Sequence, residues 1–259
     1  AGWGPLLQTG ARSIGVLAMT TEDRMSGDAA ITLEDVWVQY KVRSAHHYNL
    51  KRALVNALTR RHEAPEIITA LEAVNLTVPK GARIGIVGPN GSGKSTLLSV
   101  MSGALRPSCG TVSVHGRVLA LLGGPDEGLD PEQTGRENAL SLGVRLGESP
   151  DSMRSRIDDI HEFSGLADRF EHPLYTYSSG MQIRLRFSTI TSLKPDVLLI
   201  DEGIGMADAE FNQRASLRLT EFLSNSGTLV MASHSEALIA EHCNQKLVVN
   251  KGRAVAQRV

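Results

Sequence analysis

The sequence predicts an α/β fold, and three observations lead to this prediction. Two short apolar runs, Arg83–Val87 and Val197–Ile200, are typical of parallel strands that are covered on both faces. Residues that can begin a helix follow each run, which is the alternation expected of an α/β protein. The chain has 259 residues, 41% of them hydrophobic, so it can bury the core of one continuous, lobed unit.

Strand patterns come first along the chain. Residues Ile31–Tyr40 and Ala70–Val78 predict two strands of an antiparallel β subdomain, and Asn49–Arg61 between them predicts a short amphipathic helix. Residues 1–30 carry no such pattern and are expected to be a flexible N-terminal extension. Residues 31–259 then form the folded domain.

Helical signals dominate from about residue 124 to residue 193. Thr134 and Glu137 are spaced as a capping box, and Ser149 precedes a proline at the first position of a helix. We therefore expect a helical subdomain of about residues 124–193 inside the α/β domain. The other expected elements are strands at Thr111–Val114, Arg117–Leu122, Asp196–Ile200, Thr228–Met231, Lys246–Val249 and Ala254–Gln257, and a helix at Ala209–Ser224.

Composition limits the classes of partner. With 27 basic and 28 acidic residues, the net charge of −1 does not indicate a nucleic-acid partner. No apolar stretch approaches the roughly 18 to 20 residues of a membrane-spanning helix, and no signal peptide is recognised, so we expect no transmembrane segment. Cys109 and Cys243 lack metal-ligand spacing and suit the reduced thiols of the cytoplasm.

A glycine-rich loop follows the strand Arg83–Val87 and matches the P-loop pattern. Its glycines let backbone N–H groups point at phosphates, and a helix that begins near Ser95 adds its positive end. We expect Lys94 to reach the β- and γ-phosphates and Ser95 to ligate Mg²⁺. A turn that only caps a helix is the alternative, and GTPases, nucleotide kinases and helicases share the loop. The phosphate-binding residues are Gly88, Pro89, Asn90, Gly91, Ser92, Gly93, Lys94, Ser95 and Thr96.

Two carboxylates end the strand Val197–Ile200. We expect Asp201, beside the P-loop crevice, to contact Mg²⁺, and Glu202 to act as general base on the attacking water. The alternative is that both acids simply leave the strand for solvent.

Residues Tyr177–Leu185 resemble the signature motif of ABC transporter ATP-binding subunits, in the Ser-Ser-Gly-Met form of polysaccharide exporters. The motif lies between the P-loop and the acidic pair, at the start of a helix, where Ser178, Ser179 and Gly180 can bind an anion. In that family the anion is the γ-phosphate of ATP bound to the other subunit. The resemblance therefore implies a homodimer with two ATP molecules and Mg²⁺ between its subunits.

Three further positions resemble family residues. Asp208 resembles the aspartate of the D-loop, and His234 resembles the switch histidine that senses the γ-phosphate. Asp208 could instead be a helix N-cap, and a capping box of Ser233 with Glu236 would leave His234 incidental. Tyr40 resembles the aromatic residue that stacks on adenine, although it could be a half-buried strand aromatic and Tyr48 could take the role.

The loop after Leu122 departs from the family pattern. Most ABC domains carry a glutamine there, whereas this chain has Gly-Gly-Pro-Asp-Glu, so that Asp126 or Glu127 could substitute. Residues Pro131–Asn138 look like a stretch of O-antigen, teichoic-acid and capsule exporter ATPases. In such relatives a helix like Asn49–Arg61 lies against the membrane subunit or the membrane surface, and the alternative is an ordinary surface helix. We expect no C-terminal carbohydrate-binding domain.

The resemblance implies the ATP-hydrolysing subunit of an exporter of lipid-linked polysaccharide, of O-antigen, teichoic-acid, capsule or galactan type. It would bind a polytopic permease at the cytoplasmic face of the cell membrane. Two alternatives are an ABC ATPase for another cargo and a soluble, non-transport ABC ATPase. A third alternative is a nucleotide kinase, but this function would not explain the signature motif at Ser178–Gly180.

Overall fold

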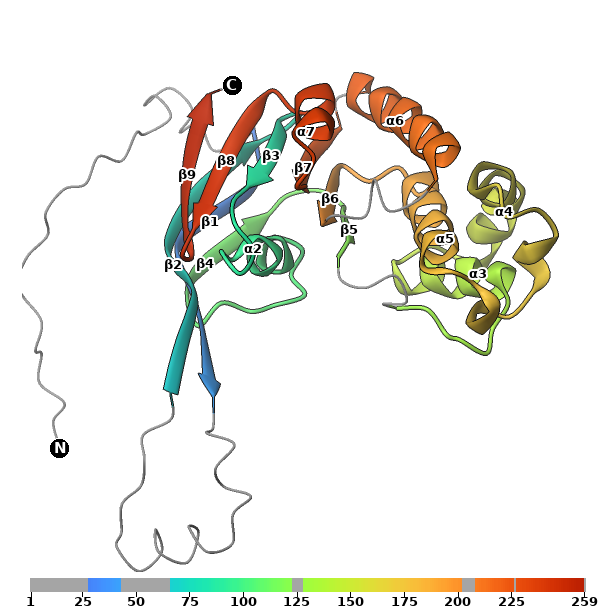
Figure 1. Cartoon of the computed structure of the whole chain (residues 1–259), viewed down its shortest axis with the longest axis horizontal. Coiled ribbons are helices and arrows are strands. Elements are labelled where there is room, and N and C mark those ends of the chain that lie inside the picture. Colours follow the sequence, from blue (N-terminus) through green and yellow to red (C-terminus); the bar gives the residue numbers. More distant parts are fainter. Residues whose placement is uncertain (1–27, 43–65, 123–127, 202–207, 226, 259) are drawn as a thin grey trace, which may run out of the picture.

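The computed structural model describes residues 28–42, 66–122, 128–201, 208–225 and 227–258. The predicted amphipathic helix at residues 49–61 and residues 1–27 of the predicted extension (residues 1–30) lie outside these ranges. Within them, the strands form an antiparallel sheet with the order β2-β1-β4 and a larger sheet with the order β5-β6-β7-β3-β8-β9 (Figure 1). The α/β class and the antiparallel β subdomain are confirmed.

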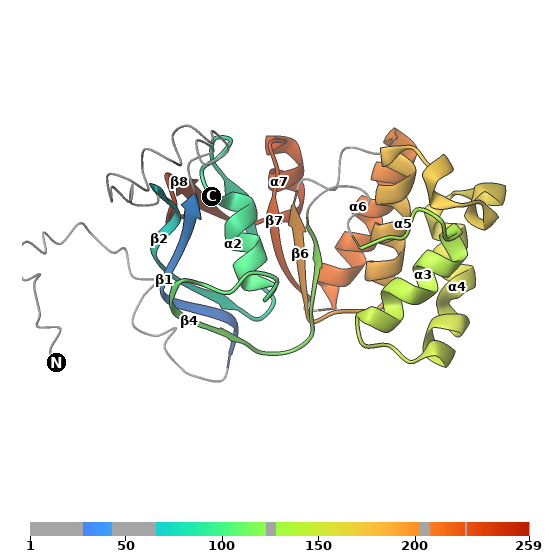
Figure 2. The same cartoon turned by 90° about the horizontal axis from the view of Figure 1, so that it is seen from below.

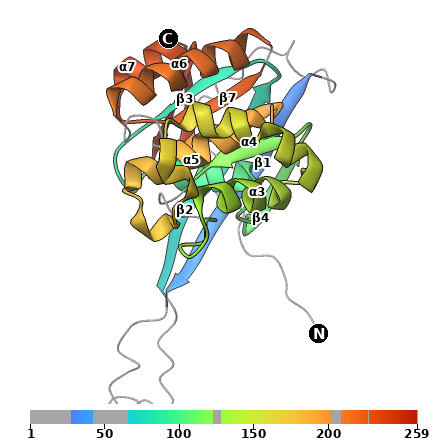
Figure 3. The ribbon, with the colours of Figure 1, turned by 90° about the vertical axis from the view of Figure 1, so that its right-hand side faces the viewer.

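The antiparallel sheet contains β1 (Ala29–Val42), β2 (Glu66–Pro79) and β4 (Cys109–Val114). Strand β1 is the central strand, because Ile31 pairs with Val78 on one side and with Val114 on the other. It begins at Ala29, so the prediction that residues 29 and 30 belong to a flexible extension is wrong: both lie in the strand, and Ala30 is buried. The far ends of β1 and β2 project from the body of the molecule (Figures 1 and 3).

The larger sheet is parallel except at one edge, where β9 (Arg253–Arg258) pairs antiparallel with β8 (Gln245–Asn250). Its other strands are β3 (Arg83–Val87), β5 (Val118–Leu121), β6 (Val197–Asp201) and β7 (Thr228–Ala232). Helix α2 (Lys94–Met101) follows β3 and packs between the two sheets (Figure 2). The central strands are thus covered on both faces, as their apolar runs predicted.

The helical subdomain lies beyond β5 and β6, on the side away from α2 (Figures 1 and 2). Its helices are α3 (Gly135–Arg145), α4 (Pro150–Ser164) and α5 (Ser179–Ser192), with short 3₁₀ turns at Ala167–Glu171 and Leu174–Thr176. The capping box of Thr134 with Glu137 and the Ser149 N-cap are both present, as predicted.

Two helices follow β6 and β7. Helix α6 (Ala209–Ser224) has the predicted bounds, whereas α7 (Glu236–His242) was not predicted. The predicted capping box of Ser233 with Glu236 is wrong. The N-cap is Ser235, whose hydroxyl accepts from the Leu238 N–H, while the Ser233 hydroxyl accepts from the Ser235 N–H. Ser233 therefore stabilises the turn before the helix.

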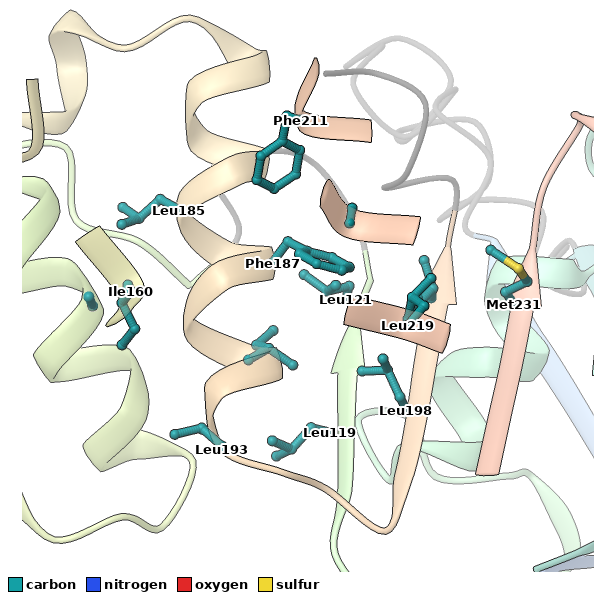
Figure 4. Close-up of a cluster of buried hydrophobic side chains, with 14 of the residues drawn as sticks. Leu119, Leu121, Ile160, Leu185, Phe187, Leu193, Leu198, Phe211, Leu219 and Met231 are labelled. Carbon is teal, nitrogen blue, oxygen red and sulfur yellow. The ribbon is translucent and has the colours of Figure 1, made fainter. Parts of the chain in front are cut away.

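Two apolar cores meet at the central sheet, and strand β6 contributes to both. Val197 and Leu199 face the core around α2, whereas Leu198 and Ile200 face the core under the helical subdomain. Figure 4 shows the second core, where Phe187 of α5 and Phe211 of α6 meet the sheet. None of the helices in the described ranges is long and apolar enough to cross a membrane.

Candidate nucleotide site

The predicted P-loop lies between β3, which ends at Val87, and α2, which begins at Lys94. Gly88 has a φ of 154° and Gly93, the residue before the helix, a φ of 110°. Gly93 has no side chain with which to cap α2, so no side-chain acceptor at this position satisfies the first N–H groups of the helix. These N–H groups and the positive end of the helix can therefore receive an anion.

The loop is held by backbone on both sides. A Cβ placed on Gly93 would lie 2.6 Å from the carbonyl oxygen of Ala70 in β2, and one on Gly88 would lie 2.0 Å from that of Val249 in β8. The Gly252 N–H, in the β8–β9 turn, donates to the Ser92 carbonyl at 2.8 Å. Glycine is thus required at both positions by positive φ and by close backbone contact.

Two polar side chains of the loop point to phosphate binding. Lys94 is only 6% exposed, and its ammonium donates to the carbonyls of Gly88 (2.9 Å) and Pro89 (3.3 Å). The Ser92 hydroxyl is buried and has no hydrogen-bond partner among the residues that the structure describes. With the uncapped helix, these groups fit a triphosphate, because it would supply acceptors for the loop N–H groups, the ammonium and the orphaned hydroxyl.

Two further candidate residues, Asp201 and His234, lie at the same edge of the sheet as the P-loop. Ala232, which ends β7, lies opposite Asp201 of β6 and Ile86 of β3, so Asp201 and His234 leave the sheet near the P-loop. A hollow of about 180 Å³ here is lined in part by Gly88, His234 and Lys246. Glu202 lies outside the described residues, so its role as general base stays a prediction.

Ser95 and Asp201 could hold Mg²⁺, which prefers oxygen ligands. Ser95 is exposed in the first turn of α2, and Asp201 is partly exposed at the end of β6. In the described ranges, no cluster of three metal-ligating acidic, histidine or cysteine side chains is present. A magnesium ion here would therefore complete its shell with phosphate oxygens and water, which is its usual mode in nucleotide sites.

The signature residues begin helix α5. Ser178 is its N-cap and accepts from the Met181 N–H at 3.3 Å, while Ser178 and Ser179 are both exposed. Tyr177, the first residue of the motif, is held by a hydrogen bond: its hydroxyl donates to the Arg169 carbonyl at 2.6 Å. Burial raises the pKa of Tyr177 to about 12, so this hydroxyl stays protonated and remains a donor.

Within one chain, the P-loop and the signature do not meet. Helices α2 and α5 lie on opposite sides of β6 in both views (Figures 1 and 2). Each chain thus carries a phosphate cradle, which is the P-loop of residues 88–96, and, elsewhere, an exposed helix N-terminus at Ser178 that can bind an anion.

Asp208 is the N-cap of α6, and this alternative prediction is confirmed. One carboxylate oxygen accepts from the Phe211 N–H at 2.9 Å, and the other accepts from Arg184 of α5 at 2.8 Å. The Phe211 N–H and the Arg184 guanidinium hold the pKa of Asp208 below its ordinary value. Arg184 thereby joins the signature helix to the start of α6, a link that no local pattern in the sequence indicated.

Comparison with known proteins decides the family. Residues 71–205 match the sequence profile of the family described as "ABC transporter". The chain belongs to this family. It is 37% identical over 224 residues to the Yersinia enterocolitica "O-antigen export system ATP-binding protein RfbE", with 83% of this chain and 92% of that one covered.

Other relatives of this ABC transporter family member are longer. The chain is 36% identical to the Myxococcus xanthus "O-antigen export system ATP-binding protein RfbB" and 32% identical to the Bacillus anthracis "Teichoic acids export ATP-binding protein TagH". In both cases 86% of this chain is covered, but only 52% and 39% of the relative. The chain therefore spans about half of the M. xanthus relative's length.

Solved structures agree on the fold. The ATP-binding cassette MJ0796, in a dimeric post-hydrolysis structure bound to ADP and phosphate, matches with a TM-score of 0.71 at 20% identity. The match covers 88% of this chain and 98% of that one. At this identity the likeness extends to the fold alone, and it includes both the sheet core and the helical subdomain.

Tyr40 lies in β1 opposite Ile68 of β2 and is 44% exposed. Two residues further along β2, the Ala70 carbonyl faces Gly93 of the P-loop. Tyr40 is thus an exposed aromatic residue on the strand pair beside the ABC cassette's P-loop, and adenine stacking stays a prediction. Tyr48 and the substitute acids Asp126 and Glu127 lie outside the described residues.

A larger hollow of about 1070 Å³ lies at the opposite ends of the strands, near Lys194, Asp196 and Thr228. It shares no lining residue with the P-loop hollow. Several of its polar groups bind one another or the backbone: Arg218 pairs with Asp159, and Asp196 accepts from the Arg117 N–H. We therefore assign the nucleotide chemistry to the smaller hollow beside the P-loop.

Proposed function

We propose that this chain is the ATP-hydrolysing subunit of an ABC exporter that moves a lipid-linked polysaccharide across the cytoplasmic membrane. One observation carries the ATPase: a phosphate cradle and an exposed signature helix lie on opposite sides of β6, so two chains arranged head to tail would complete two sites. The relatives named for O-antigen and teichoic-acid export support the cargo class.

Each residue has a part in this reaction. The backbone N–H groups of the loop residues after Pro89 and the Lys94 ammonium bind the phosphates, for which Lys94 exchanges its carbonyl partners. Ser95 and Asp201 hold Mg²⁺, which neutralises charge on the phosphate oxygens when bound. Glu202 accepts a proton from the attacking water, and His234 contacts the γ-phosphate from the end of β7.

The second chain contributes the signature. Ser178, Ser179 and the N–H group of Gly180 bind the γ-phosphate held by the partner's P-loop, and Asp208 lies beside this interface. Closure excludes water from the phosphates except the attacking molecule. The assembly also requires a polytopic permease, with the ATPase subunits peripheral at the cytoplasmic face of the membrane.

The test compares wild type with Glu202→Gln and Ser178→Arg, by steady-state ATPase activity, size-exclusion chromatography and mass spectrometry of copurified membrane proteins. We expect Glu202→Gln to abolish turnover and to trap an ATP-bound dimer, and Ser178→Arg to prevent that dimer by charge and bulk at the helix N-terminus. Normal hydrolysis by both variants as monomers would refute the mechanism.

The copurified membrane protein separates the candidate cargoes. A polytopic glycan-export permease supports the proposal, whereas a drug-exporter or nutrient-importer subunit would make the chain an ABC ATPase for another cargo. Copurification with ribosomes or DNA-repair factors, and with no membrane protein, would indicate a soluble ABC ATPase. Phosphoryl transfer to a nucleotide acceptor would favour a kinase.

A further inference from the structure

Two arginines fasten the edge strand β5 to the signature helix α5, one at each end. Before the strand, Arg117 donates to the carbonyls of Leu193, at the end of α5, and of Leu146, at the end of α3, at 3.3 Å and 3.0 Å. After the strand, Arg186 of α5 donates to the Leu122 carbonyl at 2.8 Å. Both ends of strand β5 are thus joined to the C-terminal half of helix α5.

Arg186 is the more unusual of the two because it is buried. It is only 7% exposed, and its neighbours in the sequence, Leu185 and Phe187, belong to the core under the helical subdomain (Figure 4). Burying a guanidinium is unfavourable unless its hydrogen bonds replace those with water. Removing it would leave the Leu122 carbonyl without this donor at the carboxyl end of the strand.

The acceptor of Arg186 lies beside the Mg²⁺ candidate. Strands β5 and β6 are parallel, and Leu121 lies opposite Ile200, so the next residue of each strand, Leu122 and Asp201, lie side by side. The guanidinium therefore binds the backbone next to Asp201. About two turns away, at the start of the same helix, the Ser178 N-cap is exposed at the surface.

From this geometry we infer that Arg186 is a positioning residue that couples the signature helix to Asp201. The inference rests on the proposed function. When the partner's nucleotide binds at Ser178, α5 shifts as a rigid element, and the Arg186–Leu122 hydrogen bond transmits the shift to the backbone beside Asp201. Metal binding and hydrolysis in one half of the site thus depend on whether the signature of the same chain is engaged.

The test uses Arg186→Met, which keeps the buried volume but has no donor, and Arg186→Lys, which keeps charge and donors. Arg117→Met is the control at the end of β5 remote from Asp201, where it removes two carbonyl contacts of the same kind together with the Arg117–Glu148 ion pair. The readouts are kcat, KM for ATP, the Mg²⁺ concentration for half-maximal activity, and Tm.

For Arg186→Met we expect kcat to fall about tenfold and the half-maximal Mg²⁺ concentration to rise severalfold, with KM for ATP changed less than about threefold. Arg186→Lys should recover part of both losses, because one ammonium donor can still reach a carbonyl. Arg117→Met should lower Tm without changing the Mg²⁺ dependence.

Three results would overturn the inference. Arg186→Met could hydrolyse ATP with the kcat and Mg²⁺ dependence of wild type. Both arginine variants could lose kcat and Tm in parallel at unchanged Mg²⁺ dependence, which would make Arg186 structural only. A wild type that binds no ATP would refute the proposed function itself, and that failure is recognised before any variant is compared.

Discussion

The P-loop and the signature motif are held in place by different means. Backbone holds the P-loop: the carbonyls of Ala70 and Val249 approach its glycines, and the Gly252 N–H binds its Ser92 carbonyl. Side chains hold the signature motif: the Tyr177 hydroxyl donates a hydrogen bond to the Arg169 carbonyl. A second side chain, Arg184, joins its helix to Asp208.

This difference matches the task of each region. A loop that receives phosphates through its N–H groups must be preformed to within a fraction of an ångström, and close backbone packing on both sides provides that. A helix N-terminus that meets a second chain must be exposed, so only the side of the signature helix that faces its own chain can carry the contacts that hold it. We therefore expect substitutions in the P-loop and in the signature motif to change the free energy of unfolding and the ATPase activity in different ways.

The largest effect should come from the glycines of the P-loop. Gly93→Ala places a Cβ 2.6 Å from the Ala70 carbonyl at a φ of 110°, so we expect a loss of about 3 kcal/mol or more in the free energy of unfolding and loss of ATP binding. Gly91→Ala is the control, since its φ is 72° but no atom lies within 4 Å of the added Cβ. It should lose only about 1 to 2 kcal/mol. Equal losses in urea denaturation would contradict the packing argument.

The signature anchor should come next. Tyr177→Phe removes the donor of a partly buried hydrogen bond to the Arg169 carbonyl, which predicts a loss of about 1 to 3 kcal/mol in the free energy of unfolding. ATP binding to the monomer should be unchanged, because the P-loop is held independently, while steady-state ATPase activity falls. Nucleotide titration and turnover measured on the same preparation separate these effects. Weaker binding by the monomer would show that the two regions are not independent.

The cap of α6 should have a smaller effect. Asp208→Ala loses both the N-cap bond to Phe211 and the Arg184 ion pair, and we expect about 1 to 2 kcal/mol of destabilisation. Asp208→Asn keeps an oxygen for the cap and loses only the charge, so it should lose less than about 1 kcal/mol. Thermal and urea unfolding of both variants measure the difference. If Asn is as damaging as Ala, the ion pair, and not the cap, stabilises this junction.

The smallest effect is a pH dependence at the same residue. Because the folded pKa of Asp208 is lowered, its carboxylate contributes stability above its unfolded pKa of about 3.9 and loses that contribution as the pH falls through the folded pKa. The stability difference between wild type and Asp208→Asn should thus be largest near pH 7 and disappear in strong acid. A difference that stays constant to pH 2 would show that the charge has no part.

Elements that consecutive residues specify were predicted closely from the sequence. The bounds of β3 and α6, the capping box of Thr134 and the Ser149 N-cap agree because each depends on neighbours within one turn or strand. Most other strands run one to four residues beyond the prediction at an end, since pairing with a neighbouring strand extends them. Strand β5 is the exception, because it is one residue shorter than predicted at each end. Helix α7 was missed because it is too short for a periodic pattern.

The sequence alone determined the chemistry of the site: the glycine spacing of the P-loop, Lys94, the acids after β6 and the signature residues all lie in short, continuous motifs. Only the tertiary structure decided which carbonyls approach Gly88 and Gly93, that Arg184 reaches Asp208, and that Arg186 reaches the backbone beside Asp201. Local motifs are fixed by backbone geometry over a few residues. These contacts join segments far apart in the chain, so they exist only once the sheets and helices have packed.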